Sequence, residues 1–153
     1  MNLLIIKAKP NPLGKDRIGR TFTPAIQLAA EWVDFQNIAK TAINLNGTQM
    51  YHLAYLPGKT EWELVIELSG VIQSGEIVRI HSGSPLPLNQ MNFQDTIGAN
   101  YHVFTGKNYV WNNDKLDKPY LWYKPTQQKI DLTYYDAWPV EGKILQRLND
   151  KLI

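Results

Sequence analysis

The sequence predicts an all-β protein, built as an antiparallel sandwich or barrel. Short runs of alternating apolar and polar residues recur along the chain with turn residues between them, and no long helical pattern separates them. The clearest run lies in 68–83, where Val78 and Ile80 fall on one face of a strand. Arg79 and His81 fall on its opposite face. This alternation is typical of a sheet with one buried side and one solvent-facing side.

The predicted strands share this two-residue period and end at glycine, proline or asparagine. In chain order they are 3–8, 31–37, 41–45, 48–55, 62–68, 77–82, 101–104, 109–111, 120–123 and 130–135. The pair Asn46-Gly47 is the strongest hairpin signal, and Gly75 stands where the chain must reverse before 77–82. We expect Gly47 and Gly75 to be structural turn residues.

Two helical segments are predicted outside the strands. Thr23 and Pro24 suit the N-cap and the first position of a short helix at 23–30. Apolar residues in the tail recur at the spacing of one helix face, which predicts an amphipathic helix at about 140–152. These residues are Ile144, Leu145, Leu148 and Leu152. Between the predicted strands, 83–100 is a long proline-containing loop.

Length and composition describe an ordinary globular chain. Its 153 residues suffice for one domain with its own core, and we expect a single domain over 1–153, with the β core at 3–135. The absence of Cys excludes thiol catalysis and disulfides. No apolar run reaches the length of a membrane span, and the opening MNLLIIK is too short for a signal peptide. The default expectation is therefore a cytoplasmic location without a membrane span.

The first 30 residues are more basic than the rest of the chain, although the net charge is only +2. Their basic residues are Lys7, Lys9, Lys15, Arg17 and Arg20, against one acidic residue. Clustered cations can bind phosphates, so a weak contact with DNA is one alternative function. A solvated N-terminal loop is the simpler interpretation.

The residue types that usually carry catalysis form no recognisable motif. His52, His81 and His102 lack the close spacing of paired metal ligands. The segment 81–84 lacks the first glycine of a G-x-S-x-G nucleophile elbow, and the chain has no phosphate-binding glycine loop. We therefore expect no enzyme activity, no metal and no cofactor. An enzyme would need one of these histidines to meet a carboxylate in a cleft.

The abundance of Trp and Tyr permits a second alternative, the binding of sugars by stacking on exposed rings. Trp62 and Trp111 are expected in the core because each shares a strand with aliphatic residues. Four other residues are the candidates for an exposed aromatic surface. They are Trp122, Tyr123, Tyr135 and Trp138.

Four blocks of the chain, in order, resemble the lamin tail domain, the immunoglobulin-like module of nuclear lamins that also occurs in bacterial proteins. Residues 5–16 resemble its opening strand and N-P-x-G-x-D turn, and EWVDFQN at 31–37 resembles its E-φ-V-x-φ-x-N strand. Residues 45–47 resemble its φ-L-x-G turn, and 68–80 resemble its L…G-x-x-V-x-I strand-turn-strand. More loosely, 113–121 resemble its N-x-G-D-x-x-x-L segment.

The resemblance covers about 3–135 and has departures. Thr48 and His81 stand where the family often has Trp, and the glycine before Asp117 is absent. The resemblance implies an immunoglobulin-like antiparallel β-sandwich that acts as a non-catalytic interaction or adaptor module. We therefore expect protein–protein contacts as the function, with nucleic-acid contact or carbohydrate binding as the alternatives.

Overall fold

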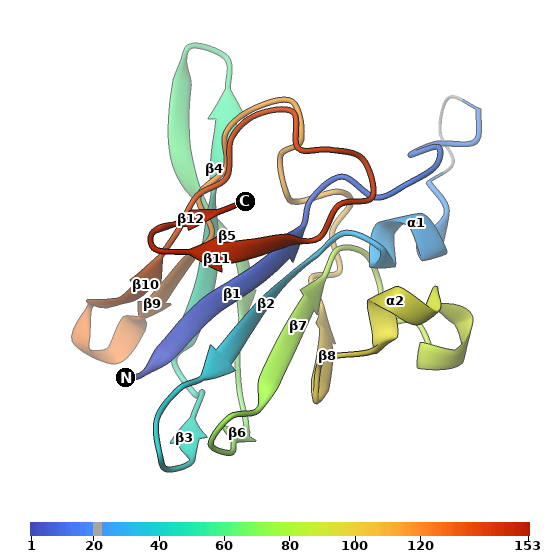
Figure 1. The fold of residues 1–153 in the computed structure, drawn as a ribbon. Coiled ribbons are helices and arrows are strands. Elements are labelled where there is room, and N and C mark those ends of the chain that lie inside the picture. Colours follow the sequence, from blue (N-terminus) through green and yellow to red (C-terminus); the bar gives the residue numbers. More distant parts are fainter. Residues whose placement is uncertain (20–22) are drawn as a thin grey trace.

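The computed structural model describes residues 1–19 and 23–153, which form an all-β fold with a few short helices (Figure 1). The strands are β1 (Leu3–Lys9), β2 (Trp32–Asn37), β3 (Ile43–Asn44), β4 (Thr48–Leu56), β5 (Lys59–Glu67), β6 (Val71–Ile72), β7 (Ile77–His81), β8 (Tyr101–Phe104), β9 (Tyr120–Tyr123), β10 (Gln128–Leu132), β11 (Leu145–Leu148) and β12 (Lys151–Leu152). The helices are α1 (Ala25–Ala29), η1 (Leu88–Gln90), α2 (Phe93–Thr96) and η2 (Lys124–Thr126). The prediction of an all-β protein is confirmed.

Two main sheets contain most of these strands. The larger sheet has the order β12-β11-β1-β2-β7-β8, and the smaller has the order β10-β9-β4-β5. Strands β3 and β6 form a separate two-stranded ribbon. Neighbouring strands of both main sheets pair antiparallel, apart from β7 and β8, which are parallel. A parallel neighbour requires a crossover, and the long β7–β8 connection that carries η1 and α2 supplies it.

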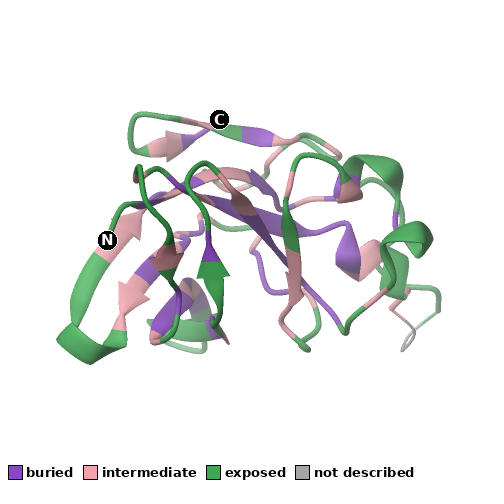
Figure 2. Ribbon diagram, turned by 90° about the horizontal axis from the view of Figure 1, so that it is seen from below, coloured by how far each residue is buried: buried purple, intermediate pink, exposed green. Residues whose placement is uncertain are grey.

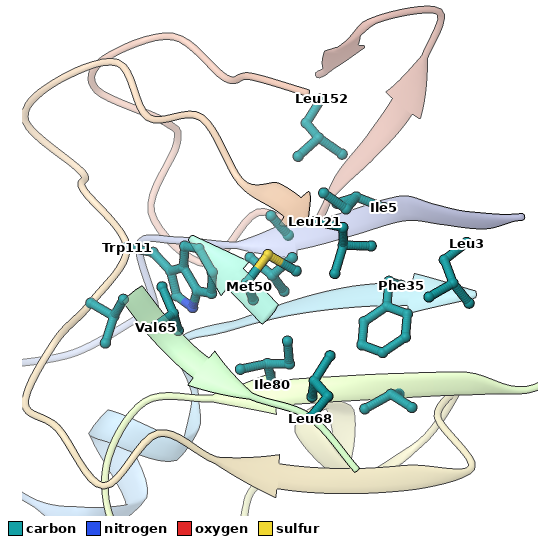
Figure 3. Packing of buried hydrophobic residues seen from close by; sticks show 14 of the residues in the cluster. Leu3, Ile5, Phe35, Met50, Val65, Leu68, Ile80, Trp111, Leu121 and Leu152 are labelled. Atoms are coloured by element: carbon teal, nitrogen blue, oxygen red, sulfur yellow. The ribbon is translucent and has the colours of Figure 1, made fainter. Parts of the chain in front are cut away.

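The two main sheets pack against each other around one apolar core. Figure 3 shows Ile5, Phe35 and Ile80 of the larger sheet lying near Met50 and Leu121 of the smaller sheet. All five side chains are fully buried. Figure 2 shows that burial is concentrated in the central strands, whereas turns and hairpin tips are exposed. The arrangement follows from the period-2 pattern, which places every second residue of each strand on the core side.

The opposite face of the larger sheet is also covered, which corrects the expectation of a solvent-facing side. Arg79 and His81 are buried there, with 2% and 0% of their surface exposed. The guanidinium of Arg79 donates to both carboxylate oxygens of Asp34 and to the backbone oxygens of Asp95 and Ile97. Because Asp95 and Ile97 belong to the β7–β8 connection, these bonds hold that segment over the sheet.

The predicted C-terminal helix is wrong, because the tail forms the hairpin β11–β12. Strand β11 pairs with the edge of β1, with Leu145 opposite Ala8. The chain reverses at Asn149, whose φ of 55° is left-handed. Leu145 and Leu152 are buried while Leu148 is 57% exposed. The free edge of β1 offers the tail a ladder of backbone hydrogen bonds, and that ladder outweighs the helical spacing of the leucines.

The predicted strand at 109–111 is irregular in the structure. Its backbone N–H groups do not join a ladder there, since those of Val110 and Trp111 both donate to Oε1 of Glu31. The hydroxyl of Ser82 donates to the same oxygen. A buried carboxylate therefore takes the place that a neighbouring strand would have had.

The two expected turn glycines both adopt the left-handed conformation, with φ of 83° at Gly47 and 80° at Gly75. The turn at Asn46-Gly47 nevertheless joins strands of different sheets, because β3 pairs with β6 and β4 pairs with β5 and β9. The hairpin predicted at this point is therefore wrong, although its turn residue is correct.

Candidate binding surface on the four-stranded sheet

The outer face of the smaller sheet carries a cluster of aromatic side chains. Along β4, β5 and β9, residues such as Met50, Val65 and Leu121 are buried. Residues adjacent to them in sequence lie on the opposite face and are half-buried or exposed, namely Tyr51, Leu64, Tyr120 and Trp122. We call this surface the aromatic face and define it by Tyr51, Trp62, Tyr120 and Trp122.

Trp62 lies on the aromatic face and not in the core, which corrects the sequence-based expectation. It is 44% exposed, and its neighbour Leu64 is 37% exposed. The pairing of β4 with β5 shifts register between Met50 and Tyr51, so that Val65 has no partner opposite it. This bulge reverses the alternation of β5, and Val65 becomes the buried residue.

The aromatic rings surround a hollow of about 300 Å³. Tyr120 is central, with its ring centroid 5.0 Å from that of Trp62, 5.9 Å from that of Trp122 and 6.4 Å from that of Tyr51. The corresponding interplanar angles are 49°, 58° and 46°. The rings are therefore inclined relative to one another and line a shallow, open hollow.

A polar row borders the aromatic face on one side. Across the strands, Trp122 stands opposite Lys129 of β10 and opposite Gln49 of β4. Gln49 in turn stands opposite Glu67 of β5. Lys129 and Glu67 are exposed, and Oε1 of Gln49 accepts a hydrogen bond from the hydroxyl of Tyr51 at 3.1 Å. The order across the sheet is therefore Lys129, Trp122, Gln49 and Glu67, in which the ammonium and the carboxylate are exposed and Gln49 is buried.

Hydrogen-bond donors of the aromatic face remain available. In the described part of the chain, the indole N–H groups of Trp62 and Trp122 and the hydroxyl of Tyr120 form no hydrogen bond with another residue. Burial, and to a smaller extent Tyr51, raises the pKa of Tyr120 above its ordinary value. The surface therefore combines ring faces with groups that can bind a polar ligand.

Of the four aromatic residues proposed from the sequence, only Trp122 lies on the aromatic face. Tyr123 is half-buried, and Trp138 is 77% exposed but belongs to a separate hollow near the C-terminus. Tyr135 is buried, with its hydroxyl 2.7 Å from the backbone oxygen of Asn112, so its expected exposure is wrong. Tyr51 and Tyr120 were not predicted as surface residues. The signal that could have identified them is their alternation with the apolar Met50 and Leu121 along β4 and β9.

The basic N-terminal residues do not form one exposed surface. Lys9 is 1% exposed and pairs with Asp95 at 2.6 Å, so it is not available to a nucleic acid. Lys7 is half-buried, whereas Lys15 and Arg17 are exposed. Arg20 lies outside the described residues. The expected phosphate-binding role of Lys9 is corrected by its burial, because an ammonium fixed inside the fold cannot meet a phosphate in solvent.

The histidines lie at two separate places. His52 is buried, with Nδ1 3.0 Å from Asp117 and Nε2 3.6 Å from Glu63. Carboxylates therefore face both of its ring nitrogens, Asp117 within hydrogen-bond distance and Glu63 farther away. His81 and His102 stack on each other, and their rings are joined by a 2.8 Å contact between Nε2 and Nδ1. Both arrangements hold parts of the fold together.

Across residues 1–19 and 23–153, no cluster of three or more His, Cys, Asp or Glu side chains is arranged to hold a metal ion. None of the helices in the same ranges has the length and apolar character needed to cross a membrane.

No protein-family model matches the chain. A comparison with curated proteins also found no match. Among solved structures, the chain is similar to a β-glucosidase involved in saponin metabolism from intestinal bacteria, at 10% sequence identity and a TM-score of 0.32. The match covers 87% of this chain and 16% of the β-glucosidase chain. A likeness at this level carries no information about ligand or activity.

Proposed function

We propose that this protein is a non-catalytic binding module that holds its ligand against the aromatic face. The observation that carries the proposal is the outward orientation of Tyr51, Trp62, Tyr120 and Trp122 around one hollow. Apolar patches on a monomer's surface commonly mark interaction sites, and Trp and Tyr contribute a large share of binding energy at such sites. The expected protein partner and the alternative sugar ligand both need a surface of this kind.

We propose a binding role without catalysis because the buried polar side chains already bind other groups of the protein. The buried histidines and carboxylates bind one another or the backbone, as His52 does with Asp117 and Glu31 with Val110. The aromatic face itself contains rings, hydroxyls and indole N–H groups, which bind and orient a ligand but do not activate a nucleophile.

We also propose that the sandwich is immunoglobulin-like and of the lamin tail type. Support comes from the order of the four sequence blocks and from the positive φ at Gly47 and Gly75 within two of them. The EWVDFQN block supplies β2, which lies between β1 and β7 in the larger sheet. An experimental structure that superposes on lamin tail domains with the same strand order tests this assignment, and a different strand order refutes it.

Retention of a ligand from fractionated cell extract tests the binding surface. The immobilised protein is compared with the variant Trp62→Ala/Tyr120→Ala and with the control Trp138→Ala, which removes an exposed indole elsewhere. We expect a protein or polysaccharide component that the wild type and the control retain and the double variant loses. Equal retention by all three proteins, with circular dichroism showing each one folded, contradicts the proposal.

A further inference from the structure

We propose that the ligand of the aromatic face is a neutral oligosaccharide. This inference rests on the proposed function, since it names the ligand class of the same surface. Three features carry it: the inclined arrangement of the rings, the polar row beside them, and the balance of charge around them. Together these features disfavour the other ligands that stack on aromatic rings, namely purely apolar partners and nucleic acids.

The shape of the hollow suits a small ring with apolar faces. Its volume of about 300 Å³ is at the lower end of the range for ligand pockets. The tilt of Trp62 and Trp122 against Tyr120, by 49° and 58°, leaves ring faces on more than one side of the hollow. A pyranose presents C–H groups on its faces, so it can pack against two of these aromatic rings at once.

The polar row supplies partners for hydroxyl groups. The exposed Lys129 of β10 and Glu67 of β5 lie on this border of the aromatic face, with Trp122 and the buried Gln49 between them. Together they offer donors and acceptors, as do the sugar hydroxyls that would meet them. A purely apolar partner would leave this row without bonds, and Lys and Glu are depleted in the centres of protein interfaces.

The charges around the rings favour a ligand without net charge. The four aromatic side chains are neutral, and the row beside them contains one ammonium, at Lys129, and one carboxylate, at Glu67. These two charges sum to zero, so a nucleic acid or an acidic polysaccharide gains no net attraction from this row. An ionic ligand would meet a repelling group of its own sign.

The strands at the centre of the aromatic face have no free edge for a peptide that binds by adding a strand. At the aromatic face, β4 pairs with β5 on one side and with β9 on the other, and β9 also pairs with β10. The backbone groups of β4 and β9 form ladders on both sides, whereas β5 and β10 are the edges of this sheet, so recognition at the centre of the face depends on side chains. A sugar needs nothing more, because it has no backbone amides to satisfy.

Titration with defined hexasaccharides tests the inference. Isothermal calorimetry and tryptophan fluorescence are recorded with cellohexaose, maltohexaose and chitohexaose, and with hexagalacturonate as the anionic counterpart. We expect saturable binding of at least one neutral sugar and none of hexagalacturonate. Affinity should fall about tenfold or more in Trp62→Ala and in Trp122→Ala, as for loss of one stacking ring. It should fall several-fold in Glu67→Gln and stay unchanged in Trp138→Ala.

Two outcomes overturn the inference in different ways. If no neutral hexasaccharide binds at millimolar concentration, while Trp62→Ala/Tyr120→Ala still abolishes retention of an extract component, the ligand class is wrong and the binding surface stands. If retention is also unaffected by the double variant, both proposals fail. Binding of hexagalacturonate in preference to the neutral sugars likewise refutes the assignment of a neutral ligand.

Discussion

The ammonium of Lys9 lies 2.6 Å from the carboxylate of Asp95, and both side chains are 1% exposed although 86 residues separate them in the chain. The same carboxylate oxygen accepts the indole N–H of Trp32 at 2.8 Å. These bonds connect the β7–β8 connection to β1 and β2. They make a buried ion pair the anchor of the segment that covers the larger sheet.

Replacing Lys9 by Met should destabilise the fold strongly. The substitution keeps the length of the side chain but leaves the buried carboxylate of Asp95 without its cation, and such a loss typically costs about 3–5 kcal/mol. Urea unfolding followed by circular dichroism measures the free energy. The double variant Lys9→Met/Asp95→Asn should recover part of the loss, because it no longer buries an unpaired charge.

The exposed Lys15 provides the matched control, and Lys15→Met should change stability by less than about 0.5 kcal/mol. If Lys9→Met is as mild as the control, the ion pair does not anchor the β7–β8 connection. Hydrogen exchange then decides whether that segment is held by Arg79 alone.

The two turn glycines should respond differently to the same substitution. Both have positive φ, so Gly47→Ala and Gly75→Ala each incur about 1 kcal/mol of backbone strain. An added Cβ at Gly75 meets open space, whereas at Gly47 it would lie 2.7 Å from Cγ of Pro125. Overpacking typically costs a further 1–3 kcal/mol or so. Thermal unfolding should therefore give a lower melting temperature for Gly47→Ala than for Gly75→Ala.

Gly75→Val should also lower stability by more than about 1 kcal/mol, because a β-branched residue is strained at positive φ. A melting temperature unchanged within about a degree in this variant would show that the turn relaxes freely. Equal losses in Gly47→Ala and Gly75→Ala would show that Pro125 moves aside.

Stability should rise with pH on the acid side because of His81. Burial lowers the pKa of His81 from 6.5 to about 3, while its ring is held between the backbone oxygen of Ala29 and the ring of His102. Between these pH values the unfolded chain binds the proton and the folded chain does not. His81 therefore contributes an increase in the free energy of unfolding with pH there, of up to about 1.4 kcal/mol per unit.

Urea unfolding between pH 4 and 7, compared with His81→Gln, isolates this contribution. Since Glu31 contributes the opposite slope above pH 4.5, the free energy of unfolding of the variant should rise less with pH, or fall more, than that of the wild type over this range. Parallel curves for the two proteins would mean that His81 takes up its proton without disturbing its contacts with Ala29 and His102.

Glu31 should give the opposite slope at higher pH. Burial raises its pKa from 4.5 to about 8, although its bonds with Ser82 and with the backbone of Trp111 and Val110 act in the other direction. From pH 4.5 to 8 the folded chain keeps a proton that the unfolded chain has lost. Stability therefore decreases as the pH rises through this window.

The range from pH 6.5 to 8 separates Glu31 from His81, which is neutral in both states there. Glu31→Gln preserves an oxygen acceptor and cannot ionise, so it should remove the decline seen in the wild type. A decline of equal steepness in the variant would assign it to another group.

Much of the β architecture could be predicted from the sequence, because strands that contribute one face to the core reveal it by alternation. The strands predicted at 77–82 and 101–104 correspond to β7 and β8 within one residue. The same pattern did not reveal that Arg79 is buried, since that depends on a cover supplied by the distant Asp95. Local alternation describes two faces but not what packs on each.

The aromatic face was less accessible to sequence reasoning. Trp62 shares its spacing with Leu64 and Ile66, and only the bulge at Val65, a property of the pairing with β4, turns it outward. The prediction of a C-terminal helix was wrong for a similar reason. The spacing of its leucines fits a helix, and only the structure shows that the free edge of β1 lies beside this segment. Both errors arise where long-range pairing decides the orientation of a side chain.

The indole N–H resonances of the five tryptophans, followed by ¹H–¹⁵N NMR during titration with the best-binding ligand, test the central claim most directly. The account predicts that the signals of Trp62 and Trp122 shift with saturation, whereas those of Trp32, Trp111 and Trp138 stay in place. Saturable shifts confined to Trp138, with Trp62 and Trp122 unmoved, would contradict it.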